Sequence, residues 1–351
     1  MIVAMRSRAT REQLDFVVRL LQDHGVDSTF STIADVMMLI VEENPAPELA
    51  ASVENAPGVE RVVLVTGAQR LTSRAFRADT TQVRVGATGG VVFGGPEFVV
   101  IAGPCAVEST AQMTAAADAV VAGGAGMLRG GAFKPRTSPY SFQGLGLAGL
   151  ALLAEQRTRT GLPVVTEVVT PADVEGVAEE SDMLQIGTRN MQNFDLLRAA
   201  GASGRPVLLK RGMSATIEEW LLAAEYVMHM GTSDVVLCER GIRSYDRSTR
   251  FTLDLSAVVE AKRLTHLPVI VDPSHSTGRP HLVAPMSLAA AACGADGLII
   301  DVHTDAQNAL CDGAQALTAE DFTSLTERLR PVIQAVGRTL APPRPHTLAQ
   351  V

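Results

Sequence analysis

Eight short apolar runs alternate with helical segments over the last two thirds of the chain. The runs are rich in β-branched residues and lack polar alternation, which is typical of parallel strands buried on both faces. Eight such β-α units predict an α/β fold, a (β/α)8 TIM barrel. An open doubly wound sheet is the alternative, but no GxGxxG motif opens the first unit. The runs cover 99–102, 125–128, 164–167, 183–186, 207–210, 235–238, 269–271 and 297–300.

Residues 1–66 show a different order of elements. Strand patterns alternate with two helical ones in the order β-α-β-β-α-β, which predicts a ferredoxin-like domain with both helices on one face of a small sheet. Thr10, with Gln13 three residues later, predicts a capping box at the start of the first helix. We expect this domain to serve regulation or subunit pairing, and a purely structural pairing module is the alternative.

Two segments flank the predicted barrel, which spans 98–338. Residues 67–97 predict a linker with a β-hairpin, in which 81–85 pair with 91–93 across a glycine-rich turn and cover one end of the barrel. Residues 339–351 end in APPRPHTLAQV and predict a disordered tail.

Composition limits the possible partners. The chain of 351 residues has a formal net charge of −8 and a pI near 5.4, which disfavours nucleic-acid binding. Its four cysteines show no CxxC spacing, which indicates a reduced, cytoplasmic setting. The N-terminal apolar run is too short for a signal peptide, and no apolar stretch of about 18 residues predicts a membrane span.

Basic side chains gather in the loop after the second apolar run. The segment 128–146 reads LRGGAFKPRTSPYSFQGLG and places Arg129, Lys134 and Arg136 close together. Arg and Lys on a strand-to-helix loop suit phosphate and carboxylate oxygens. Pro135 and Pro139 stiffen the loop, so less order is lost on binding. A solvated basic loop is the alternative interpretation.

Further cations follow other runs, at the strand ends where barrels carry their active sites. Two phosphates and one carboxylate carry roughly −4 to −5 at neutral pH, a load that six cations match. Each cation alone could be a surface ion-pair partner, so the prediction rests on their convergence. The set comprises Arg129, Lys134, Arg136, Arg189, Lys210 and Arg240.

A second set of strand-end residues combines a thiol, an imidazole and two carboxylates: Cys105, His275, Asp301 and Asp312. These groups together suit a divalent transition metal such as Mn, Fe, Co or Zn. Four ligands with open coordination positions indicate a catalytic rather than a structural site. Each also has a structural interpretation, as a small buried thiol, a turn-capping histidine or an ion-paired carboxylate.

These motifs closely resemble the 3-deoxy-D-arabino-heptulosonate 7-phosphate (DAHP) synthase family, class I, in the subtype with an N-terminal ferredoxin-like domain. The resemblance rests on GPCAVES at 103–109, the 128–146 loop, IGTRNMQNFDLL, PVLLKRG, LCERGIRSYD, DPSHSTGR and the DVH…LCDG ending. It implies condensation of phosphoenolpyruvate with erythrose 4-phosphate and water, giving DAHP and phosphate. This transferase reaction begins the shikimate pathway of aromatic amino acid biosynthesis.

The resemblance also implies roles for individual residues. Arg129, Arg189, Lys210 and Arg240 would hold phosphoenolpyruvate. Lys134 would bridge both substrates, and Arg136 and Thr137 would bind erythrose 4-phosphate. The metal ligands would be Cys105, His275, Asp301 and Asp312. Lys134 or His275 would move protons, and Glu167 would position the attacking water.

Two positions depart from the family pattern. Asp301 stands where the family usually has Glu, and its side chain is one methylene shorter, about 1.5 Å along the chain. Cys311 stands where the family usually has Ser. Metal preference or affinity is therefore expected to differ from the family's, and we expect Cys311 to lie near Cys105, where a disulfide could form.

The sequence is compatible with two alternative functions. The related 3-deoxy-D-manno-octulosonate 8-phosphate (KDO8P) synthases use arabinose 5-phosphate, but their loop typically reads KANR where 134–137 read KPRT here. A catalytically inactive regulatory barrel is the other alternative. The resemblance further implies a homo-oligomer, expected to be a tetramer, and an aromatic amino acid effector. Near the effector strands Phe30 could line a pocket or join the core, and the core is favoured.

Overall fold

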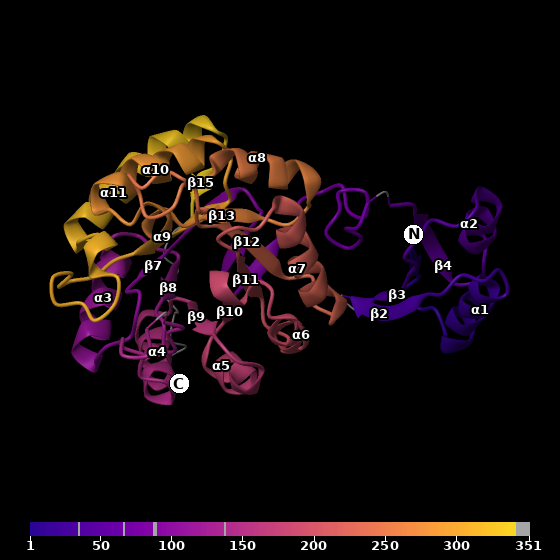
Figure 1. The fold of residues 1–351 in the computed structure, drawn as a ribbon, viewed down its shortest axis with the longest axis horizontal. Coiled ribbons are helices and arrows are strands. Elements are labelled where there is room, and N and C mark those ends of the chain that lie inside the picture. The colour runs from indigo at the N-terminus through magenta and orange to yellow at the C-terminus, as the bar shows by residue number, and fades with distance from the viewer. Residues whose placement is uncertain (34–35, 66, 87–89, 137, 342–351) are drawn as a thin grey trace, which may run out of the picture.

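The computed structural model describes residues 1–33, 36–65, 67–86, 90–136 and 138–341. The chain forms a small N-terminal unit beside a large barrel, and Figure 1 shows the two joined by a single extended segment. None of the helices in these ranges is long and apolar enough to cross a membrane.

The N-terminal unit has the predicted β-α-β-β-α-β order. Its strands form one antiparallel sheet in the order β2-β3-β1-β4, the ferredoxin-like arrangement. Both α1 and α2 pack on this sheet and share its apolar core. The bounds are β1 Ile2–Met5, α1 Arg11–Gln22, β2 Thr29–Ile33, β3 Val36–Ile40, α2 Pro47–Glu54 and β4 Val59–Val63.

Local sequence explains the first helix. The Thr10 hydroxyl accepts from the Gln13 amide, and the Gln13 side chain accepts from the Thr10 amide, so the predicted capping box is present. Leu14, Val17 and Leu21 recur at helical spacing and are buried against the sheet. Phe30 was expected in the core, and this is wrong for the single chain, since 42% of its surface is exposed.

The rest of the chain confirms the (β/α)8 barrel. Within the described residues, eight parallel strands pair with their neighbours in chain order, and β14 pairs with β7 to close the cylinder. The alternative of an open sheet is therefore wrong. The strands are β7 Glu97–Gly103, β8 Met127–Arg129, β9 Val164–Val168, β10 Met183–Ile186, β11 Val207–Lys210, β12 Val235–Glu239, β13 Val269–Val271 and β14 Gly297–Asp301.

Helices cover the outside of the barrel (Figure 1). Trp220 on α7 is fully buried, and its indole nitrogen donates to the Leu209 carbonyl at 3.1 Å, which ties this helix to β11. The helices are α3 Thr110–Ala122, α4 Leu147–Thr160, α5 Val174–Glu180, α6 Phe194–Ala202, α7 Ile217–His229, α8 Leu255–Leu264, α9 Pro273–Thr277, α10 Pro280–Ala292 and α11 Ala319–Ala335, with 3-10 turns at Pro171–Asp173, Thr188–Asn190 and Gly313–Gln315.

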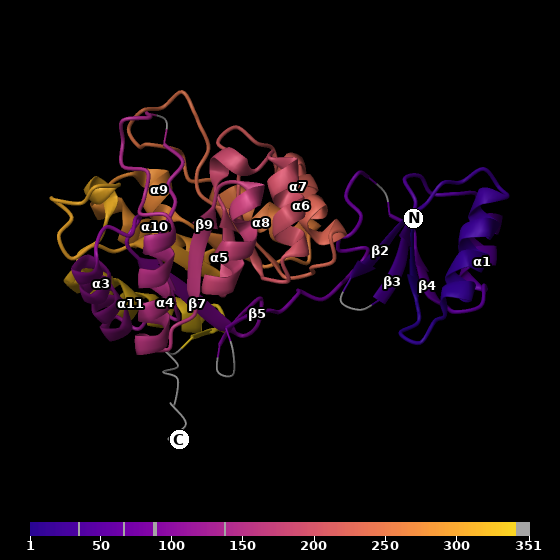
Figure 2. The same ribbon diagram turned by 90° about the horizontal axis from the view of Figure 1, so that it is seen from below.

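A short hairpin fills the amino-terminal end of the barrel. Its strands β5, Val83–Val85, and β6, Val91–Phe93, pair antiparallel. Their apolar side chains form one cluster with the inward-facing residues of the barrel strands. Figure 2 shows β5 at the edge of the barrel opposite the long loops near α9. Access to the interior is therefore left to the carboxyl-terminal end.

The linker before this hairpin is fixed to the barrel by one acidic side chain. The Glu225 carboxylate on α7 accepts from the backbone amides of Arg70, Leu71 and Thr72 at 2.7, 3.0 and 2.7 Å. The N-terminal unit also touches this helix, because the Ser31 hydroxyl donates to the His229 carbonyl at 3.0 Å. One helix thus contacts both the linker and β2.

The expected disordered tail begins too early. Thr339 and Leu340 form a short strand, β15, parallel to β7, and Ala341 is buried. A pattern of two residues is too short to predict from sequence, and its pairing partner β7 lies near the start of the barrel segment, far away in the chain. Residues 342–351 lie outside the described residues.

Candidate active site

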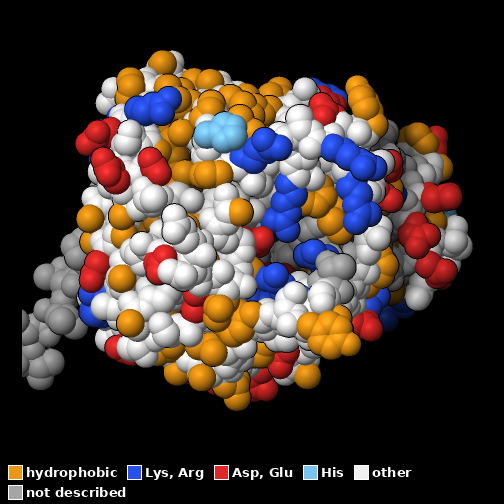
Figure 3. Space-filling model, turned by 60° about the vertical axis from the view of Figure 1, so that its left-hand side comes forward, with side chains coloured by type: hydrophobic (Ala, Val, Ile, Leu, Met, Phe, Trp, Pro, Cys, Tyr) orange, Lys and Arg blue, Asp and Glu red, His pale blue; other side chains and the backbone are white. Residues whose placement is uncertain are grey.

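One cavity opens at the carboxyl-terminal ends of the barrel strands. Lys and Arg side chains gather around this hollow in Figure 3. All six predicted cations line it: three come from the segment 129–136, and the other three come from the ends of later strands. Its lining consists of Arg129, Lys134, Pro135, Arg136, Ser138, Ser141, Glu167, Gln185, Gly187, Thr188, Arg189, Lys210, Arg240, Arg250, His275 and Asp312. Thr137, the remaining predicted substrate residue, lies outside the described residues.

Two of the cations are buried in ion pairs. Arg129, the last residue of β8, is bonded to Asp301, the last residue of β14. Lys210 ends β11 and donates to Asp272 at 2.6 Å. The carboxylates satisfy these cations within the barrel and fix the ends of the two side chains. Buried charges require such partners, because an isolated one would cost several kcal/mol.

Asp272 also orients His275. One carboxylate oxygen of Asp272 accepts the backbone amide of His275 at 2.8 Å and so caps α9, and the other lies 2.8 Å from the ring Nδ1. Burial would raise the pKa of Asp272, but His275 and Lys210 hold it well below its usual range. Because Nδ1 of His275 faces Asp272, the other ring nitrogen, Nε2, points away from Asp272.

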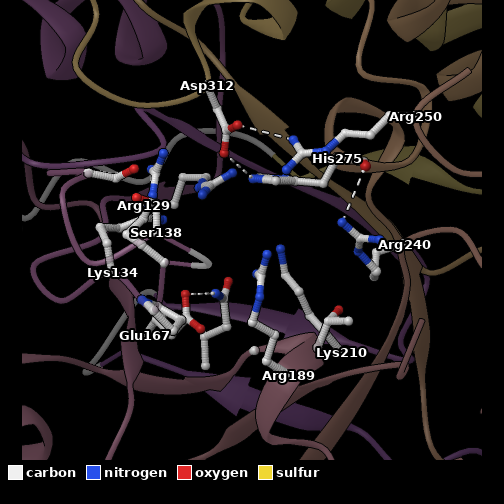
Figure 4. Close-up of a pocket in the computed structure, with 16 residues that line it drawn as sticks. Arg129, Lys134, Ser138, Glu167, Arg189, Lys210, Arg240, Arg250, His275 and Asp312 are labelled. Atoms are coloured by element: carbon white, nitrogen blue, oxygen red, sulfur yellow. Dashed lines mark hydrogen bonds and ion pairs between the residues drawn. The ribbon is translucent and has the colours of Figure 1, made fainter. Parts of the chain in front are cut away.

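Glu167 lies across the cavity at the inner wall of β9. Its carboxylate accepts a hydrogen bond from the side-chain amide of Gln185 at 3.3 Å (Figure 4). A Cβ atom at position 187 would lie 1.9 Å from a Glu167 oxygen, so only glycine leaves room for this carboxylate. Figure 4 shows Arg189 and Lys210 projecting into the cavity near Glu167.

Lys134 links the cavity to Cys105. Its ammonium lies 3.1 Å from the Cys105 sulfur and 3.0 Å from the Cys105 carbonyl. The neighbouring Cys311 thiol, Lys134 and His275 hold the pKa of Cys105 well below its usual value, although burial opposes this. Burial also disfavours the charge of Lys134, but the Cys105 thiolate and Glu167 outweigh it and raise the pKa of Lys134. Both shifts favour a charged pair between the Cys105 sulfur and the Lys134 ammonium.

The four predicted metal ligands come together at one side of the cavity. The Cys105 sulfur lies 3.6 Å from His275 Nε2 and 3.2 Å from an Asp312 oxygen. His275 Nε2 lies 3.4 Å from Asp301 and 3.6 Å from Asp312. A thiolate, an imidazole nitrogen and carboxylate oxygens at such separations fit a divalent transition metal ion. Two groups of side chains could hold one: Cys105, His275 and Asp301, and Cys105, Cys311 and Asp312.

The sequence analysis missed several residues that line the cavity, and Arg250 and Gln185 are two of them. Arg250 donates to Asp312 at 3.0 Å and to Gln315 at 2.9 Å, and it fixes the carboxylate that faces Cys105. Gln185 points inward from the middle of β10 and bonds Glu167. The loop that carries Arg250 also contains the predicted Arg240, which was the available signal. Gln185 is the one polar residue of the apolar run 183–186, a signal that the rule for strand ends does not use.

Some strand-end charges do not reach the cavity lining. Arg211 follows β11 but forms a buried pair with Glu239 at 2.9 Å and a second contact with Asp254 at 3.2 Å. Burial raises the pKa of Glu239 even though Arg211 opposes the shift. These charges hold the loops together rather than facing a ligand.

The fold and the site define a class: a (β/α)8-barrel enzyme with a polycationic pocket next to a cluster of side chains that could hold a metal ion. The DAHP synthetase I family profile matches residues 75–335. The phospho-2-dehydro-3-deoxyheptonate aldolase of Thermotoga maritima is 43% identical over 337 residues, which cover 96% of this chain and 99% of that protein. The chain belongs to the DAHP synthetase I family.

Solved structures similar to this chain support the same family assignment. The crystal structure of the Thermotoga maritima aldolase, described as a DAHP synthase, matches with a TM-score of 0.76 at 42% identity and covers 97% of this chain and 98% of that one. A truncated form of that synthase covers 78% of this chain. A 2-dehydro-3-deoxyphosphooctonate aldolase of Desulfatibacillum aliphaticivorans is 33% identical over 261 residues, but it covers only 69% of this chain.

Proposed function

We propose that this protein is a DAHP synthase, a transferase that condenses phosphoenolpyruvate with erythrose 4-phosphate and water to give DAHP and phosphate. The observation that carries the proposal is the convergence of six cations on one cavity beside the cluster of metal-binding groups. Family membership and the 43% identity to a phospho-2-dehydro-3-deoxyheptonate aldolase support it. An inactive barrel is disfavoured because the cationic lining is complete.

Phosphoenolpyruvate is assigned to four of the six cations, of which Arg129, Lys210 and Arg240 are buried and Arg189 is exposed. Arg129, Arg189, Lys210 and Arg240 bind its phosphate and carboxylate, and Lys134 lies between this site and that of the second substrate. Arg240 packs over the Phe251 ring at 4.2 Å, which holds its guanidinium in place. The aldehyde phosphate is assigned to Arg136 and Thr137. Clamping both substrates brings C3 of phosphoenolpyruvate to near-attack distance from C1 of the aldehyde.

The side chains also suggest how protons and water are handled. Glu167 is fixed by Gln185 and is assigned to position the water that adds at C2. His275 Nε2 faces Cys105, Asp301 and Asp312, so a metal ion would occupy this nitrogen. Lys134 is therefore the better candidate for moving protons between the substrates. Phosphate then leaves by cleavage of its bond to C2.

The metal ligands are assigned to Cys105, His275, Asp301 and Asp312. A divalent ion bound there would act as a Lewis acid on the aldehyde oxygen. The N-terminal unit is assigned to regulation, by pairing between subunits of a tetramer and by binding an aromatic amino acid. Phe30 supports this, because its ring is exposed in the single chain and lies under the Arg11 guanidinium at 5.4 Å. A cytoplasmic location stays a prediction.

The test is phosphoenolpyruvate consumption by the purified protein, with erythrose 4-phosphate or arabinose 5-phosphate as the second substrate. Each reaction is run with EDTA, and again after Mn is added back. Turnover on erythrose 4-phosphate that EDTA removes and metal restores is the expected result. Preferential turnover of arabinose 5-phosphate would instead favour the KDO8P synthase reaction. Light scattering, and rates with added Tyr or Phe, test the tetramer and the effector.

A further inference from the structure

Cys311 is a second thiol beside the metal-binding groups. Its sulfur lies 3.6 Å from the Cys105 sulfur and 3.7 Å from an Asp312 oxygen. Arg136 also contacts it. Both cysteines are free and buried beside Ala106, and three polar groups still contact the Cys311 sulfur. A thiol that only filled space would need none of these partners.

The backbone explains how two consecutive side chains reach the same place. Asp312 adopts a left-handed conformation with φ of 54°, and it is the only described residue other than glycine with positive φ. Aspartate tolerates this region better than most residues. In an extended chain neighbouring side chains point to opposite sides. The turn instead brings both Cys311 and Asp312 toward Cys105.

The separations match the coordination shell of a small ion. Bonds from zinc of about 2.3 Å to sulfur and 2.0–2.2 Å to oxygen or nitrogen place tetrahedral ligand atoms roughly 3.4–3.8 Å apart. Two of the three distances among Cys105, Cys311 and Asp312, at 3.6 and 3.7 Å, lie in this range, and the third is 3.2 Å. His275 Nε2 lies 3.6 Å from both Cys105 and Asp312.

Asp301 has competing partners. One of its oxygens is bonded to Arg129, and the other accepts from Gln315 at 2.6 Å. A metal ion must share this fully buried carboxylate with a guanidinium and an amide. Sharing weakens its contribution of negative charge to the ion. A second thiolate supplies charge on the side of the ion where Asp312 lies.

We propose that Cys311 is an additional metal ligand, so that two thiolates hold the ion in this chain. The inference rests on the proposed function, because it concerns the ion assigned to that site. Thiolates favour borderline and soft ions, whereas manganese prefers carboxylate oxygen and water. The centre of this chain therefore selects zinc or cobalt over manganese.

The test uses cobalt alone as a spectroscopic probe. Metal-free full-length protein is titrated with Co²⁺ under reducing conditions, and the near-ultraviolet thiolate-to-cobalt charge-transfer absorption is recorded per bound ion. This absorption reports the number of thiolate ligands and does not depend on catalysis. Because one of two thiolates is lost, Cys311→Ser should show about half the absorption of the unmodified protein. Its ratio of zinc to manganese affinity should fall by roughly tenfold.

Matched variants separate the possible outcomes. Cys293→Ser removes a free cysteine that does not line the cavity, and it should keep the full absorption. Cys311→Ala repeats the test with no oxygen that could replace the sulfur, and circular dichroism verifies the fold of each variant. Full absorption in both Cys311 variants, with loss in Cys105→Ser, would overturn the inference and leave the proposed ligand set intact. Full absorption in Cys105→Ser would reject that ligand set itself.

Discussion

The two ends of the barrel bury different kinds of side chains. At the amino-terminal end the hairpin inserts Val83, Val85, Val91 and Phe93 among apolar strand residues, and all four are buried. At the carboxyl-terminal end β8, β11, β12 and β14 finish in charged residues, which are buried in ion pairs such as Arg129 with Asp301. Apolar packing fills one end, and paired charges line the other.

This difference shows how the molecule separates stability from chemistry. Burial of apolar surface stabilises by about 25 cal/mol per Å² and asks for no specific partner. A buried ion pair often contributes little net stability, because desolvation offsets the attraction. The charges of the carboxyl-terminal end, the open end, therefore serve binding and chemistry. The amino-terminal end, which the hairpin closes, supplies part of the free energy of folding that holds these charges in place. Substitutions at the two ends should have separable effects.

The largest effect is expected for Lys134→Ala at the open end. The loss of the ammonium between the two proposed substrate sites should lower kcat by about 10³. The fold should survive, because this side chain is only partly buried on a loop. Steady-state phosphoenolpyruvate consumption and thermal unfolding measure the two effects. Arg247→Ala, an exposed arginine that does not line the cavity, is the control. Near-normal turnover of Lys134→Ala would remove this residue from the mechanism.

Phe93→Ala at the closed end should lower stability and leave turnover nearly unchanged. The ring is fully buried beneath the barrel, so its loss should lower the free energy of unfolding by about 3–5 kcal/mol. The kcat of the protein that remains folded should change little. Urea unfolding and kinetics below the new midpoint test both statements. Phe16→Ala, at an exposed position of α1, should cost about 0.5 kcal/mol or less. A variant with normal stability and poor turnover would refute the separation of the two ends.

A pH effect should appear where the linker meets the closed end. His266 is buried between the Thr81 hydroxyl at 2.7 Å and the Leu71 carbonyl at 2.6 Å. Burial lowers the pKa of His266 from 6.5 to about 4, so the unfolded chain binds the proton more tightly than the folded one. Stability should therefore fall as the pH falls, by about 2 kcal/mol from pH 7 to 5.

The variant His266→Gln isolates this effect, because other titrating groups remain the same in both proteins. Urea unfolding at pH 7 and pH 5 should show a smaller loss of stability in the variant than in the unmodified protein. Equal losses in the two proteins would mean that His266 does not couple proton binding to folding.

The features that could be predicted from sequence are those set by local pattern. The buried apolar runs located the barrel strands, because a strand covered on both faces must be apolar along its length. The rule that barrel sites lie after the strands then located Arg189 and Lys210. Gln185 and Arg250 could not be predicted in this way. A side chain inside the barrel and the path of a long loop depend on contacts between distant parts of the chain.

The smallest effect is expected for Asp301→Glu, which restores the length that the family usually has. The present carboxylate already lies 3.4 Å from His275 Nε2, within the span of a shared ion. Its site is fully buried, so an extra methylene must be accommodated against Arg129 and Gln315 at a cost of about 1–3 kcal/mol.

For Asp301→Glu, the longer reach of the carboxylate should raise the affinity for zinc, and the poorer packing should lower it by nearly the same amount. Competition with a chelator should therefore show zinc affinity within about tenfold of the unmodified protein. Asp312→Glu is the matched control: it lengthens a carboxylate that Arg250 holds nearer to solvent. An increase in zinc affinity well above tenfold in Asp301→Glu would mean that the shorter side chain fails to reach the ion. The open end would then be limited by geometry rather than by the pairing of its charges.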